Sequence, residues 1–295
     1  MEPIATIPVS NTLGEGVQWD VEGQALWWTD IQERRLFCCD WATRGLKTFV
    51  MPERVGAFGL LERGDAIIAA FESGIALCDL AGGAPQWLGR PDAALSGVRF
   101  NDGRVDRQGR FWAGTMVETE PRAAIANLYC VDRRGALHRR EGAITISNGL
   151  CWSPDSRRMY FADSPLRTIC VYDFDADDGT ISNRRPFAQT PQGAHPDGAT
   201  IDADGYMWSA HWGAGKVVRY APDGTVERAF DVPASQPTCV AFGGPDLDLL
   251  FVTSAREGLS ADRLANEPGA GNVFVYKTGF KGLPERRYVL DVDGS

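Results

Sequence analysis

Short apolar stretches alternate with polar turns along the whole chain, without long helical runs between them. The recurring phrase is an apolar strand, a turn that contains Gly, Asp or Pro, and a second apolar strand. Residues 105–112 and 201–208 are clear copies, and both carry Asp-x-x-Gly in the turn. Alternating apolar positions that are rich in β-branched and aromatic residues predict β-hairpins.

The hairpin phrase occurs in six copies, which begin near residues 17, 60, 105, 152, 201 and 242. Their spacing of about 40–50 residues is that of a four-stranded propeller blade. A third apolar strand follows each hairpin, for example residues 35–40 and 168–173. We therefore predict an all-β fold, a six-bladed β-propeller, in which residues 1–295 form a single domain. The alternative is two stacked β-sandwiches, which explain the even repeat less well.

A ring of blades has to close, because an unpaired strand edge invites aggregation. We expect residues 4–7 to close it by pairing with the last blade, near residues 287–290. This would remove the exposed edges.

The charge and hydropathy of the chain exclude several classes of partner. The chain has 30 basic and 39 acidic residues and a formal charge of −9, with no dense Lys/Arg cluster, so we expect no nucleic-acid partner. No apolar run is long enough to span a membrane, and the start of the chain lacks a basic and an apolar signal segment. The seven Cys form no Cys-x-x-Cys pair and are expected to be free thiols in a reducing compartment. A cytoplasmic protein with no membrane partner is the expectation.

One column of the aligned repeats is polar. Four residues before the reference position of each copy stand Glu15, Asn101, Asn148 and Asp197, with Ala57 and Thr238 as the approximate equivalents in the second and sixth copies. The first strand of a propeller blade lines the central channel, so this column should form a ring at one channel mouth. Two carboxylates and amide oxygens suit a hard divalent cation such as calcium, magnesium or manganese. The alternative is turn chemistry, since Asn-Gly and Asp-Gly are favoured turn dipeptides.

Further polar residues are expected at the same mouth. Arg99 lies two residues before Asn101, on the same strand face, and Glu118 follows a strand that leads back to the mouth. His195 and His211 could also reach this rim, and their roles stay open.

Several motifs occur in order from about residue 10 to residue 280. They are Leu-Gly-Glu-Gly at 13–16, Arg-Phe-Asn-Asp-Gly at 99–103, Ala-Gly-Thr-Met at 113–116, Ile-Ser-Asn-Gly-Leu at 146–150, Ile-Ser-Asn-Arg-Arg at 181–185, Pro-Asp-Gly at 196–198, Phe-Gly-Gly-Pro-Asp at 242–246 and Thr-Ser-Ala-Arg-Glu-Gly-Leu-Ser at 253–260. Together they resemble the regucalcin and gluconolactonase family, also called the SMP-30-like family.

The resemblance implies a six-bladed propeller with one divalent cation, held by Glu15, Asn148 and Asp197. Calcium is the first expectation, with zinc, manganese, magnesium and iron(II) as alternatives. The resemblance also implies that Arg99, Asn101 and Glu118 contact a small-molecule sugar lactone.

We therefore expect metal-dependent hydrolysis of an aldonolactone of the gluconolactone, xylonolactone or arabinonolactone type. Asp197 would serve as a metal ligand and as the general base. No Gly-x-Ser-x-Gly elbow is present, which argues against a covalent serine route. The alternatives are a related propeller hydrolase acting on organophosphates or aryl esters, a non-catalytic calcium-binding regulator, and an interaction scaffold.

Overall fold

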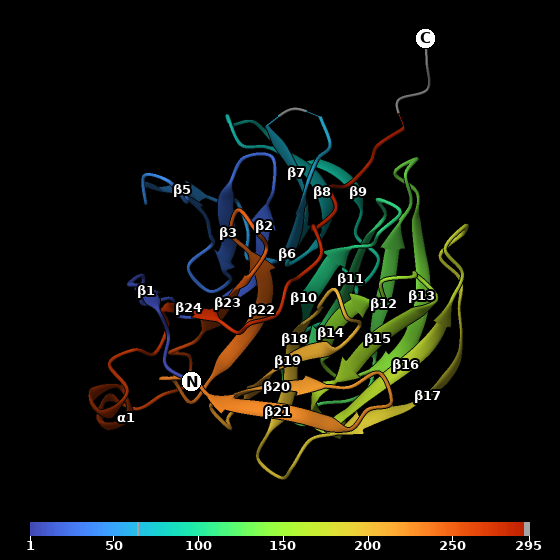
Figure 1. The fold of residues 1–295 in the computed structure, drawn as a ribbon. Helices are drawn as coiled ribbons and strands as arrows, with labels where there is room; N and C mark the ends of the chain where they lie inside the picture. Colours follow the sequence, from blue (N-terminus) through green and yellow to red (C-terminus); the bar gives the residue numbers. More distant parts are fainter. Residues whose placement is uncertain (64, 292–295) are drawn as a thin grey trace.

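Six four-stranded antiparallel sheets follow one another around a common axis in the computed structural model, which describes residues 1–63 and 65–291 (Figure 1). The innermost strands of neighbouring sheets contact one another, and the first sheet contacts the last through β2 (Gly14–Asp20) and β22 (Pro237–Gly243). The prediction of an all-β, six-bladed propeller is therefore confirmed.

The strands fall into blades in chain order. The first three blades contain, from the channel outward, β2, β3 (Ala25–Asp30), β4 (Arg35–Asp40) and β5 (Leu46–Val50); β6 (Val55–Leu60), β7 (Ala66–Phe71), β8 (Gly74–Asp79) and β9 (Gln86–Gly89); and β10 (Val98–Val105), β11 (Phe111–Val117), β12 (Ala126–Val131) and β13 (Leu137–Ile144). The last three contain β14 (Ser147–Trp152), β15 (Arg158–Asp163), β16 (Thr168–Phe174) and β17 (Ile181–Gln189); β18 (His195–Ile201), β19 (Met207–Trp212), β20 (Lys216–Tyr220) and β21 (Val226–Asp231); and β22, β23 (Leu249–Ser254), β24 (Val273–Lys277) and β1 (Ala5–Ile7).

Helix is scarce in the described part of the chain. It consists of α1 (Ala261–Asn266) and the 3-10 turn η1 (Ser164–Leu166). The side chain of Ser260 caps α1 by accepting a hydrogen bond from the backbone N–H of Arg263. Among the described residues, neither helical segment has the length and apolar character needed to cross a lipid bilayer.

The N-terminal strand closes the ring, as expected, but its partner differs from the prediction. β1 pairs antiparallel with β24, so that Ala5 lies opposite Val275 and Ile7 opposite Val273. β24 is the third strand of the last blade, and β1 pairs with its outer edge as the fourth strand. The partner predicted at residues 287–290 was therefore wrong.

Residues 287–290 instead run across the blades at the end of the chain. Tyr288 donates its backbone N–H to the carbonyl of Leu60, and Val289 donates to that of Gly109, so this segment joins the second and third blades. The Tyr288 side chain is fully buried and donates its hydroxyl to the carbonyl of Asp132. The apolar pattern of residues 287–290 therefore reflects burial against the blades, and this segment is not the partner of the closing strand.

The Asp-x-x-Gly turns of two blades share one hydrogen-bond pattern. The carboxylate of Asp106 accepts from two backbone N–H groups of its own turn and from Trp112 Nε1 at 3.0 Å. Asp202 does the same, with Trp208 Nε1 at 2.9 Å. Each aspartate thus ties its hairpin to the tryptophan six residues later, which explains why these two blades share the motif.

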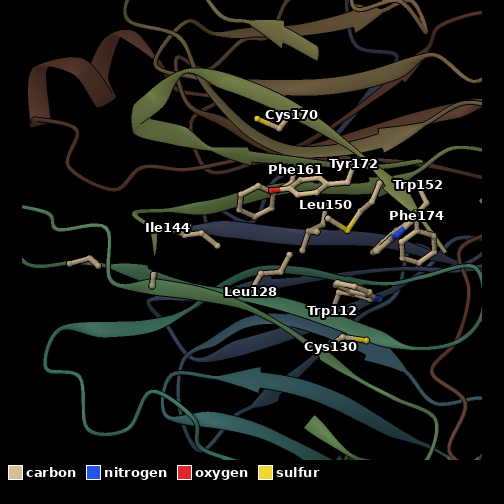
Figure 2. Close-up of a cluster of buried hydrophobic side chains, with 13 residues drawn as sticks. Trp112, Leu128, Cys130, Ile144, Leu150, Trp152, Phe161, Cys170, Tyr172 and Phe174 are labelled. Atoms are coloured by element: carbon tan, nitrogen blue, oxygen red, sulfur yellow. The ribbon is translucent and has the colours of Figure 1, made fainter. Parts of the chain in front are cut away.

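Large side chains fill the spaces between blades. Figure 2 shows the cluster between the third and fourth blades, where Trp112, Trp152 and Phe174 lie together. The ring centroids of Trp112 and Trp152 are 5.9 Å apart, within the range of favourable aromatic pairs. All seven cysteines are free, and all but the partly exposed Cys38 are buried.

Candidate functional site

The polar column lies on strand bulges, not on turns. All six innermost strands break register within two residues of the column position, between Glu15 and Gln18 in β2 and between Asn148 and Cys151 in β14, for example. Gly16 and Gly149 follow the polar residues with φ of +59° and +69°, a region that side chains with a Cβ avoid. A bulge redirects the neighbouring side chain, so these glycines help aim the polar column at the channel.

A cavity of about 280 Å³ opens at this end of the channel. Five of the six predicted site residues line it, namely Glu15, Arg99, Asn101, Asn148 and Asp197. The column therefore meets at one place, although its residues are up to 182 positions apart in sequence. The remaining wall is partly apolar and includes Leu13, Met116, Ile146, Pro165 and Trp212.

The amide of Asn148 is held in one orientation. Ser164 Oγ donates to the carbonyl of Pro196 at 2.7 Å, which uses its single hydrogen. It can therefore only accept from Asn148 Nδ2, which lies 2.7 Å away. The other end of the amide, Oδ1, accepts a 3.3 Å hydrogen bond from Asn101 Nδ2 and keeps a second lone pair for a ligand in the cavity that Asn148 lines.

Arg99 is fixed by a network that includes Glu118. Its Nε donates to Glu118 Oε1 at 2.8 Å, and its Nη1 donates to the Phe100 carbonyl and to Asn101 Oδ1, both at 2.9 Å. Glu118 also accepts two hydrogen bonds from Arg54. The Glu118 carboxylate is thus engaged behind Arg99 and is not among the cavity-lining residues. Its predicted contact with the sugar stays a prediction.

The carboxyl groups of Glu15 and Asp197 are buried together. Burial is the largest cause that raises the pKa of both groups, and the charges of neighbouring carboxylates add to it. Asp102, also buried, is one of these neighbours and accepts from the backbone N–H of Leu150 at 3.1 Å. Arg99 opposes the effect only in part. Several carboxylates in a low-dielectric space require protons or a cation to balance them.

The donor set fits a hard divalent cation. Two carboxylates and the Asn148 Oδ1 atom are oxygen ligands of the kind that calcium, magnesium and manganese accept. Within residues 1–63 and 65–291, no group of three or more His, Cys, Asp or Glu side chains could hold a metal ion. The candidate set therefore depends on its amide oxygen.

The two histidines of the fifth blade have different surroundings. His195 lines the cavity, and its Nδ1 lies 3.2 Å from the carbonyl of Ser164, to which it can only donate. His211 is buried, with Nε2 3.1 Å from the Tyr220 hydroxyl, and burial lowers its pKa to about 4. His211 is therefore a neutral core residue.

Sequence reasoning missed Arg54, Asp102 and Ser164. Asp102 follows Asn101 directly, and its place in the Arg-Phe-Asn-Asp-Gly motif was a signal that could have been used. Arg54 precedes β6, and Ser164 begins the 3-10 turn after β15, at positions that the repeat does not mark. No pattern in the sequence pointed to them.

The chain is similar to known proteins over nearly its whole length. The family model described as SMP-30/Gluconolactonase/LRE-like region matches residues 13–256. The chain is 40% identical over 277 residues to the 6-deoxy-6-sulfogluconolactonase of Pseudomonas putida, covering 93% of this chain and 94% of the relative. It is 39% identical to the L-arabinolactonase of Azospirillum brasilense, with coverages of 94% and 92%.

A solved structure described as a calcium-binding protein, regucalcin, from Agrobacterium tumefaciens superposes with a TM-score of 0.92. It is 32% identical and covers 98% of this chain and 99% of that chain. The family match spans most of the chain, and the relatives and the solved structure align over nearly all of it. The chain belongs to the SMP-30/gluconolactonase/LRE-like family.

Proposed function

We propose that this protein is a metal-dependent lactonase that hydrolyses an aldonolactone to the aldonic acid. The observation that carries the proposal is the meeting of two buried carboxylates, Glu15 and Asp197, with the oriented oxygen of Asn148 in a cavity that also contains Arg99. The names of relatives that are 39–40% identical, a sulfogluconolactonase and an arabinolactonase, support a sugar lactone as the substrate class.

Glu15, Asn148 and Asp197 would hold the cation, because their oxygens reach the same cavity. Calcium is our first choice, since the similar solved structure is described as calcium-binding. A bound divalent cation supplies Lewis acidity, which polarises a carbonyl and lowers the pKa of water.

Arg99 and Asn101 would bind the substrate oxygens. Arg99 is preorganised because Glu118 and two acceptors on its own strand already hold Nε and Nη1. Its Nη2 has no acceptor among the described residues and can donate to a ligand. Asn101 Oδ1 is occupied by Arg99, and its Nδ2 makes one good bond to the Ser147 carbonyl at 3.0 Å and a longer one to Asn148. Both Nδ2 hydrogens thus have an acceptor within the protein, and the longer bond to Asn148 is the one that a substrate oxygen would replace. Fixed donors of this kind stabilise charge that develops during reaction.

Asp197 is the proposed general base. Its carboxylate would take a proton from the water that attacks the lactone carbonyl carbon. The bond between the carbonyl carbon and the ring oxygen then breaks. The ring oxygen takes the proton from Asp197, which gives the open-chain hydroxy acid. A general base of this kind contributes about 10²–10⁴ in rate.

Hydrolysis of a panel of aldonolactones, followed by acid release in a pH-stat, tests the proposal. The panel is run with protein treated with chelator and with the same protein after calcium, manganese, magnesium or zinc is restored. We expect turnover of at least one aldonolactone that chelator abolishes and metal restores. Faster turnover of an aryl ester or an organophosphate than of every lactone would contradict the proposal, as would full activity in chelator.

A further inference from the structure

The candidate cavity contains two arginines, and only one of them is held by a buried network. Arg99 is 4% exposed and is surrounded by acceptors. Arg122 lines the same cavity from the loop between β11 and β12. A positively charged group at the wall of a small cavity selects ligands by charge, so the partners of Arg122 decide what it can do.

Arg122 has only one ion-pair partner among residues 1–63 and 65–291. Its Nε lies 3.2 Å from Glu120 Oε1, and the two side chains are 37% and 71% exposed. An exposed pair of this kind is worth little. Over the same residues, no hydrogen bond involves its two terminal nitrogens, which therefore keep four donor hydrogens for a ligand.

Positive and negative side chains also lie on opposite sides of the cavity. Arg122 belongs to the third blade, and Glu257, which follows β23, belongs to the sixth blade on the opposite side of the ring. Glu257 adds to the negative potential at Glu15. The side of Arg122 is therefore the side of the cavity that favours an anionic group.

We propose that Arg122 is a specificity-determining residue that binds an anionic substituent, a sulfonate, phosphate or carboxylate, at the end of the sugar lactone remote from the carbonyl. This rests on the proposed lactonase function. The lactone ring would lie near Arg99 and Asn101, the proposed substrate-binding residues, and the planar guanidinium of Arg122 would offer two parallel N–H groups to two oxygens of the anion. The substrate class is therefore an acidic sugar lactone.

The test compares D-glucono-1,5-lactone with its 6-deoxy-6-sulfonate, a probe whose sulfonate binds divalent cations weakly. The kcat/KM ratio of charged to neutral lactone is measured for the wild type, Arg122→Gln and Arg122→Lys. Arg134→Gln is the matched control, because Arg134 is an exposed arginine of the β12–β13 turn on the same blade. Unfolding midpoints confirm that each variant folds.

We expect the wild type to prefer the sulfonated lactone, and Arg122→Gln to lower the charged-to-neutral ratio about 10-fold, chiefly through KM. Arg122→Lys should retain part of the ratio, and Arg134→Gln all of it. Added salt should lower the wild-type ratio and leave that of Arg122→Gln nearly constant.

A ratio that is the same in wild type and Arg122→Gln overturns the role of Arg122 while leaving the lactonase function intact. Failure of the wild type to hydrolyse either gluconolactone overturns this inference, and failure on every lactone of the panel, with metal restored, overturns the proposed function with it.

Discussion

Replacement of Glu15 by Gln should stabilise the metal-free protein above pH 5, although it removes a proposed ligand. Glu15 is 7% exposed, and burial together with the charge of Asp102 raises its pKa from an ordinary value of 4.5 to about 8. The unfolded chain releases this proton near pH 4.5, whereas the folded chain keeps it to about pH 8. The contribution of the protonated Glu15 carboxyl to the free energy of unfolding is thus fully present below pH 4.5, and it is lost as the pH rises toward 8.

The size of the effect follows from the pKa difference. One pKa unit corresponds to about 1.4 kcal/mol, so at pH 7 the wild-type carboxyl costs the metal-free fold at most about 3 kcal/mol. Glutamine has no such cost, and it preserves an oxygen that can accept the backbone N–H of Gly16, as Glu15 Oε2 does at 3.1 Å. For a chain of this length, about 3 kcal/mol corresponds to an increase of about 6 °C in the unfolding midpoint.

Thermal unfolding in chelator at pH 5, 7 and 8.5 is the assay. The midpoint difference between Glu15→Gln and the wild type should be small at pH 5 and should grow with pH. Saturating calcium should reverse the order, because the variant lacks one ligand charge. Glu62→Gln is the control, since Glu62 is exposed. A metal-free Glu15→Gln that is no more stable than the wild type at pH 8.5 would refute the reasoning.

Three further substitutions, the last with a matched control, separate binding, chemistry and folding. Asp197→Asn should lose about 10²–10⁴ in kcat at saturating metal, with occupancy checked by elemental analysis; near-normal turnover of a fully occupied variant would mean that another group is the base. Arg99→Ala should raise KM for the lactone and leave metal affinity unchanged by calorimetry; loss of metal would contradict its assigned role. Asp202→Ala leaves Trp208 Nε1 without its acceptor and removes the buried carboxylate of Arg219, which keeps only more exposed partners such as Glu227 at 3.2 Å, and should cost about 3 kcal/mol in urea unfolding. Asp204→Ala, at a carboxylate 3.8 Å from Arg219 and 68% exposed, should cost far less.

The blades could be predicted because each one repeats the same local physics. The turns at Asp106 and Asp202 use the same backbone and tryptophan hydrogen bonds, so the same residues appear at the same place in these two blades. The closing partner could not be predicted in this way. Residues 287–290 have the apolar character of a strand, but in the folded chain Tyr288 is buried between blades. The strand that pairs with β1 is β24 instead.

Only the site residues that share a position in the repeat could be predicted from the sequence. Glu15, Asn148 and Asp197 share one position in the repeat, and a common bulge brings that position to the channel, so alignment alone could group them. Ser164 and Arg54 act through contacts between segments that no repeat relates, namely the bond to Asn148 and the bonds to Glu118. Their roles follow from geometry that becomes visible only in the folded chain.

The location of the cation tests the account most directly. Crystals grown with manganese and measured at the manganese absorption edge should give one strong anomalous peak in the cavity. We expect oxygens of Glu15, Asn148 and Asp197 to lie within about 2.0–2.6 Å of that peak. A peak that lies away from these three side chains, or a cavity without one at saturating manganese, would contradict it.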